Sequence, residues 1–123
     1  MILVDTSVWI DHLNGSDPVL VSLLNEEQVL THPYVIGEIA LGSLRSRESV
    51  IGALLDLPCA LVATPAETLF MIERDRLFNR GIGYVDASLL ASARLHPGTT
   101  VWTRDKRLKA AANELNLGAL LEH

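Results

Sequence analysis

The chain has one cysteine, few aromatic residues and no excess of basic charge, and each shortage excludes a class of protein. Cys59 has no second cysteine to pair with, which excludes an internal disulfide and a Cys-x-x-Cys metal site. We expect this thiol to be buried, because Leu57, Ala60 and Leu61 around it are apolar. Ten Lys and Arg residues against fifteen Asp and Glu give a net charge of −5, so a basic arm that coats duplex DNA is excluded.

Long hydrophobic runs are also missing. The apolar run Ile2–Val4 ends at Asp5, and no run approaches the ~18 residues that span a membrane. We therefore expect neither a signal peptide nor a membrane segment, and a cytoplasmic protein. The 123 residues, 49% of them hydrophobic, suit one globular domain. We expect it to cover residues 1–120, because residues 121–123 (LEH) resemble the remnant of a purification tag.

Strand-like and helix-like segments alternate along the chain. We expect strands at residues 2–4, 29–31, 60–63, 100–103 and 117–120, and helices that begin near residues 6, 18, 33, 47, 65, 84 and 106. The fifth of these helices is predicted to run to about residue 79. This alternation predicts an α/β fold, with helices on both faces of a parallel sheet of four to five strands.

Three aspartates fall where ligands bind in open α/β sheets, outside the carboxyl ends of the strands. Asp5 directly follows the first strand, and Asp105 lies two residues beyond the strand at 100–103. Asp86 lies in the first turn of a helix that follows a glycine-containing loop. Each of them could instead simply cap a helix, and that alternative stays open.

Glu38 lies inside a helix, between Gly37 and Ile39, too far from the start to cap it. Because burying a carboxylate is costly without a cation or hydrogen bonds, we expect an interior side chain that faces a cation. Asp86 shares a helical face with Leu90, so its carboxylate is expected to point toward packed side chains. Four carboxylates without Cys or His nearby suit Mg²⁺ or Mn²⁺ rather than zinc. The residues therefore indicate metal-dependent phosphodiester or phosphate chemistry.

Four short motifs occur in a fixed order along the chain: VDTSVWI at residues 4–10, GEI at 37–39, DASLLA at 86–91 and WTRDKRL at 102–108. Together they resemble the PIN domain, and specifically the VapC toxins of type II toxin–antitoxin pairs. The resemblance covers essentially the whole chain. It implies a three-layer α/β/α sandwich and an endoribonuclease, a hydrolase that cleaves RNA phosphodiester bonds by metal-activated water.

The resemblance also assigns site residues and a cofactor, Mg²⁺ or Mn²⁺. Catalytic and metal-binding roles fall to Asp5, Glu38, Asp86 and Asp105, the last of which can act through water. Thr6, Ser7 and Thr103 match supporting hydroxyl residues. The basic run beside the site adds RNA-binding candidates that would hold flanking phosphates, with a solvated helix face as the alternative: Arg104, Lys106, Arg107 and Lys109.

Partners follow from the same resemblance. It implies an RNA substrate, a homodimer, and a VapB-like antitoxin that holds the toxin inactive and makes the contact with DNA. The apolar second helix and segment 50–57 are candidate surfaces for such a partner. Two other functions stay open: a non-catalytic α/β interaction domain, and a Mg²⁺-dependent phosphotransfer domain of the receiver type. We expect Trp9 and Trp102 in the core and assign no chemistry to His32.

Overall fold

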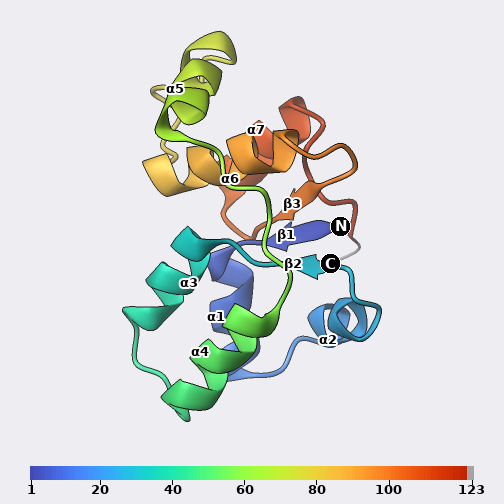
Figure 1. Ribbon diagram of the computed structural model, residues 1–123. Coiled ribbons are helices and arrows are strands. Elements are labelled where there is room, and N and C mark those ends of the chain that lie inside the picture. Colours follow the sequence, from blue (N-terminus) through green and yellow to red (C-terminus); the bar gives the residue numbers. More distant parts are fainter. Residues whose placement is uncertain (122–123) are drawn as a thin grey trace.

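The computed structural model describes residues 1–121, in which three parallel strands form a sheet of order β2-β1-β3 (Figure 1). The strands are β1 (Ile2–Val4), β2 (Val29–Leu30) and β3 (Thr100–Trp102). Ile2 pairs with both Val29 and Thr100, so β1 is the central strand. The parallel α/β fold is confirmed. Glu122 and His123 of the expected tag remnant lie outside the described residues.

Helices cover both faces of the sheet (Figure 1). On one side lie α1 (Thr6–Asn14), α3 (Pro33–Ala40) and α4 (Arg47–Asp56), with α2 (Pro18–Asn25) beside them. On the other side lie α5 (Pro65–Arg74), α6 (Tyr84–Arg94) and α7 (Lys106–Glu114). Within residues 1–121 no helix has the length and apolar character needed to cross a membrane.

Several helices begin where the sequence supplies a cap. The Asp17 carboxylate accepts the N–H groups of Val19 and Leu20 at 2.9 and 3.0 Å, at the start of α2. Thr64 and Glu67 form a reciprocal capping box at the start of α5. A cap satisfies N–H groups that have no partner inside the helix, and each is worth about 1 kcal/mol.

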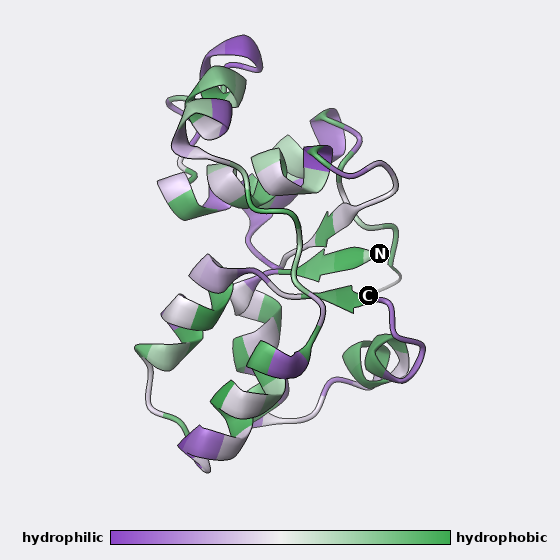
Figure 2. Ribbon diagram, in the orientation of Figure 1, coloured by the Kyte–Doolittle hydropathy of each residue, from purple (hydrophilic) through white to green (hydrophobic). Residues whose placement is uncertain are grey.

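The core lies between the sheet and the two helical layers. Leu3 and Val4 of β1 are fully buried, and β1 and β2 are among the most hydrophobic segments (Figure 2). In α6 every residue from 87 to 93 is buried, and this helix packs against β3. Trp9 and Trp102 are buried too, as predicted. The central strand and α6 therefore form a rigid support for the residues that follow β1 and precede α6.

Segment 60–63 does not form the strand that its composition predicts. Within the described chain, pairing with the sheet at this point is limited to one parallel bridge between Thr31 and Cys59, just before the segment. The N–H of Ala63 donates to the Ser92 hydroxyl instead of to a carbonyl of a neighbouring strand. Cys59 is exposed, so its predicted burial is wrong, because the residue lies at the open edge of the sheet beyond β2.

Two further segments near chain turns also differ from expectation. Residues 117–120 contribute one bridge, Val101 to Gly118, through hydrogen bonds of Val101 with the Leu117 carbonyl and the Ala119 N–H. The sheet in residues 1–121 therefore has three strands, not four to five. Helix α5 ends at Arg74 rather than near residue 79, because Arg76 and Asn79 have positive φ (52° and 59°) and cannot continue a right-handed helix.

Candidate active site

Asp5 lies at the carboxyl end of β1 and is 6% exposed. Its Oδ2 accepts two hydroxyl hydrogen bonds, from Thr103 at 2.7 Å and from Ser7 at 2.9 Å. Although Asp5 is the N-cap residue of α1, its side chain makes no cap hydrogen bond, so the helix-cap interpretation is wrong here. Both donors hold the same oxygen, and Oδ1 receives no hydrogen bond from residues 1–121.

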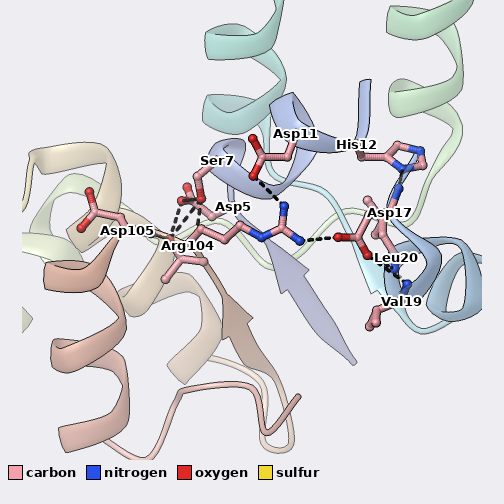
Figure 3. Close-up of polar contacts among 10 residues, drawn as sticks. Asp5, Ser7, Asp11, His12, Asp17, Val19, Leu20, Arg104 and Asp105 are labelled. Carbon is pink, nitrogen blue, oxygen red and sulfur yellow. Dashed lines mark hydrogen bonds and ion pairs between the residues drawn. The ribbon is translucent and has the colours of Figure 1, made fainter. Parts of the chain in front are cut away.

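The two hydroxyls connect the ends of β1 and β3, and Figure 3 shows Ser7 beside Asp5. The Thr103 hydroxyl also accepts the N–H of Asp105 at 3.0 Å, and the Ser7 hydroxyl accepts the N–H of Arg104 at 3.0 Å. Parallel neighbouring strands end at the same edge of a sheet, so the loops after β1 and β3 meet there. These bonds therefore fix the position of Asp105 relative to Asp5.

Asp86 and Asp105 both cap helices, as the simpler interpretation predicts. Asp105 Oδ1 accepts the N–H groups of Arg107 and Leu108 at 2.9 and 3.0 Å, at the start of α7. Asp86 Oδ2 accepts the N–H of Gly83 at 3.1 Å, at the start of α6. In each case the cap uses one carboxylate oxygen. Capping therefore fixes both side chains and is compatible with a ligand on the other oxygen.

Glu38 is exposed, so its predicted burial is wrong. The buried face of α3 consists of Val35 and Ile39, four residues apart, and Glu38 lies on a different face. Its Oε1 accepts the hydroxyl of Thr6 at 2.7 Å. Because Thr6 directly follows Asp5, this bond brings the glutamate to the side of the first aspartate.

The four carboxylates interact through their charges. The pKa of Asp86 is raised, first by burial and then by the negative charges of Asp5, Asp105 and Glu38, and the Gly83 N–H opposes the rise. Within residues 1–121 none of the four forms an ion pair. They are therefore a negative cluster without a cation supplied by this part of the chain.

This cluster fits a hard divalent cation. Its donors are carboxylate and hydroxyl oxygens, which are ligands for Mg²⁺ or Mn²⁺. As they stand, no three His, Cys, Asp or Glu side chains among the described residues are placed to hold one ion jointly. Mg²⁺ usually keeps several waters and is held through one or two carboxylates, so it does not require three such side chains around one ion. The four carboxylates do not match a zinc site, which has three or four direct protein ligands.

Arg104 is occupied by partners on the α1–α2 side (Figure 3). Its Nη1 lies 2.6 Å from Asp11, and its Nη2 pairs with Asp17. Burial favours the neutral form of Asp17, but the backbone N–H of Leu20 and the Arg104 guanidinium lower its pKa overall. The sequence analysis missed this pairing, because nothing near Asp17 in sequence indicates a partner 87 residues away.

The other basic candidates divide between two surfaces. Lys106 and Lys109 line a pocket together with Thr103. The Arg107 side chain lies on Gly81 instead: its Cδ is 2.7 Å from where a Cβ would be. Gly81 has φ +76°, so the turn and this close approach both require glycine. Arg104 and Arg107 are thus held by protein contacts, and the two lysines face solvent.

Comparisons with known proteins show which family the chain resembles. The family model described as the PIN domain matches residues 2–114. Ribonuclease VapC32 of Mycobacterium tuberculosis, in strains CDC 1551 and H37Rv, is 52% identical over 114 residues, 93% of this chain and 92% of the relative.

Two solved structures are similar in fold. FitAcB from Neisseria gonorrhoeae has a TM-score of 0.64 and 23% identity, over 92% of this chain and 94% of that one. FitAB bound to an IR36 DNA fragment has a TM-score of 0.63 and 19% identity, over 100% and 99% of the two chains. At these identities the two structures support the fold alone.

Proposed function

The chain belongs to the PIN-domain family, and from this membership we propose that Asp5, Glu38, Asp86 and Asp105 are the catalytic and metal-binding residues of a VapC-type toxin. As a relative of Ribonuclease VapC32 at 52% identity, the chain is an endoribonuclease that hydrolyses RNA. The interaction-domain and receiver-type alternatives are therefore not retained. Residues 1–120 form the proposed PIN domain.

One observation carries the assignment of the site. Three carboxylates from separate elements, Asp5, Asp105 and Glu38, all raise the pKa of the half-buried Asp86, and no ion pair within residues 1–121 neutralises any of the four. Such an arrangement destabilises the folded protein unless a cation binds it. The repulsion therefore supports a divalent cation, Mg²⁺ or Mn²⁺, as the cofactor.

The side chains have separate tasks in this proposal. A bound divalent ion supplies an activated water nucleophile and neutralises the charge of the scissile phosphate. Thr103 and Ser7 hold Asp5 Oδ2, which leaves Oδ1 available to a ligand. Thr6 holds Glu38 beside Asp5, and the cap hydrogen bond from Gly83 holds Asp86. The carboxylates position the ion and do not attack phosphorus themselves.

We propose that the antitoxin occupies an apolar groove between α1, α2 and α4. The groove has a volume of about 320 Å³, and Trp9, Leu13, Leu24 and Leu54 are among its lining residues. Leu13 is 37% exposed. An amphipathic helix that inserts apolar side chains into such a groove is a common recognition mode. This location agrees with the surfaces predicted from the second helix and segment 50–57.

We propose a homodimer formed through α5. This helix exposes Leu69 (57%) and Phe70 (65%), and nearby Phe78 is 49% exposed. Large apolar side chains gathered on one surface are typical of protein interfaces. DNA contact is assigned to the antitoxin, because the net charge of −5 does not favour direct binding. The toxin would meet its RNA in the cytoplasm.

The test compares Asp5→Asn and Asp86→Asn with Asp56→Asn, an exposed acid at the end of α4. We expect cleavage of total RNA in Mg²⁺ or Mn²⁺ to fall by more than about 100-fold in the first two variants and to be unchanged in the third. Mn²⁺ should raise the melting temperature of the original chain more than that of either site variant. In metal-free buffer Asp86→Asn should be at least as stable as the original, since it removes the repulsion. Cleavage retained in either site variant, or in excess chelator, would contradict the assignment.

A further inference from the structure

A second pocket lies at the outer edge of the sheet, between α7 and segment 117–121. It has a volume of about 360 Å³, and Trp102 and Ala119 are among its lining residues. Thr103 lines the same pocket, and its hydroxyl donates to Asp5. The pocket therefore adjoins the acidic site, and the two share one residue.

One face of α7 supplies the polar wall of this pocket. Lys106, Lys109 and Asn113 are spaced i, i+3 and i+7, line the pocket, and are exposed. The Asn113 side chain lies across Gly118, where a Cβ would come within 3.1 Å of Asn113 Cγ. The pocket thus presents two ammonium groups and an amide above an apolar floor, and Arg104, paired with Asp11 and Asp17, also lines it.

The placement of these lysines is unfavourable for the helix itself. The first turn of α7 contains Lys106 and Arg107 and no acidic residue, so the N-cap Asp105 supplies the one carboxylate at this positive end of the helix. Arg74, Arg80, Arg94 and Arg104 are all in ion pairs, whereas Lys106, Arg107 and Lys109 of α7 form none within residues 1–121. Unpaired positive charge at this end is stabilised by a bound anion.

We propose that this pocket binds the nucleotide next to the scissile phosphate of single-stranded RNA. Lys106 and Lys109 contact the phosphate of that nucleotide, and its base lies on the apolar floor with the Asn113 amide as hydrogen-bonding partner. The volume lies within the range of small-molecule sites. The proposal rests on the proposed ribonuclease site and defines where the substrate strand continues from it, toward α7 rather than toward α4.

The experiment measures binding without cleavage. Anisotropy of a short fluorescent 2′-O-methyl RNA of mixed sequence is recorded in chelator at several salt concentrations, because each phosphate contact with a single strand contributes about 0.7 to the slope of log affinity against log salt. We expect the double variant Lys106→Gln/Lys109→Gln, which loses the one phosphate contact, to lower the slope by about 0.7, and each single variant to lower it by part of that amount. Arg76→Gln, an equal charge change at an exposed position, should leave it unchanged.

Two more variants separate a pocket from diffuse attraction. Ala119→Leu fills the pocket without a change of charge, and should weaken binding at least tenfold with the slope unchanged. Arg107→Gln alters the same helix end on the surface next to Gly81. A slope change for Arg107→Gln equal to that for Lys109→Gln, or normal binding by Ala119→Leu, would overturn the pocket.

The binding assay also separates this proposal from the proposed ribonuclease site. RNA held by the lysines in a chain that cleaves nothing would refute the catalytic assignment and keep the pocket. Normal metal-dependent cleavage with unchanged salt slopes in both lysine variants would refute the pocket alone.

Discussion

His32 is a buried histidine whose protonation should destabilise the folded chain. It is 0% exposed, and its Nδ1 accepts the N–H of Tyr34 at 3.1 Å as the N-cap of α3. The proton therefore resides on Nε2, which lies 3.0 Å from the Ser92 hydroxyl. That hydroxyl also accepts the N–H of Ala63, so the neutral imidazole connects α3, α6 and segment 60–63.

The magnitude follows from the pKa. Burial lowers the pKa of His32 from 6.5 to about 4, so the unfolded chain binds a proton more readily than the folded one between these values. The stabilisation is thus complete above pH 6.5 and is lost as the pH falls through that window. At about 1.4 kcal/mol per pKa unit, we expect a loss of about 2 kcal/mol by pH 5 and about 3 kcal/mol below pH 4.

The assay is urea unfolding, followed by the fluorescence of buried Trp9 and Trp102 between pH 7.5 and 4.5. The matched variant is His32→Asn, which keeps a cap acceptor for Tyr34 but has no titrating group. Its unfolding free energy should be lower at pH 7.5, and the gap to the original chain should close as the pH falls. An equal pH dependence in both proteins, or a His32 pKa near 6.5 by NMR titration, would refute the reasoning.

Two further predictions concern residues around the acidic site. Thr103→Val removes the donor to Asp5 and is expected to lower kcat for RNA cleavage about tenfold or more. Thr103→Ser keeps the hydroxyl and should retain most of the activity. Equal activity of the valine and serine variants would show that the hydroxyl has no positioning role. Arg104→Met leaves the Asp17 carboxylate, which is 12% exposed, without its cation and should lower the unfolding free energy by about 1–2 kcal/mol. Asp11→Asn breaks the exposed pair with Arg104 and should lower the unfolding free energy by less than about 1 kcal/mol. Both variants are measured by urea unfolding, and equal losses of unfolding free energy would contradict this account.

The helix starts were predictable from sequence, whereas the outer strands were not. Asp17 and Thr64 cap their helices through bonds that span two or three residues, so the local sequence contains the whole interaction. A strand needs partners that are distant in sequence. Segment 60–63 has strand-forming composition, but the Ser92 hydroxyl takes the N–H of Ala63, and no local pattern reveals that competition.

The location of the acids was predictable and their environment was only partly so. Asp5 and Asp105 meet because parallel strands β1 and β3 are neighbours, which is a rule of topology. Glu38 was identified by an expected burial that the structure contradicts, since α3 buries Val35 and Ile39 instead. Its recognition therefore depended on the family motif, not on the energetics of a buried carboxylate.

The acidic site and the basic pocket together explain how a chain of net charge −5 can bind a polyanion. A phosphate cannot approach four carboxylates unless a cation neutralises them, so binding at the scissile position depends on metal. In the proposed arrangement Lys106 and Lys109 attract the strand without metal, because they line the pocket beside the acidic site and no carboxylate within residues 1–121 pairs with them. On this proposal the lysines would hold the strand beside the acids, and the neighbouring phosphate would enter the site only when Asp5, Glu38, Asp86 and Asp105 hold a cation.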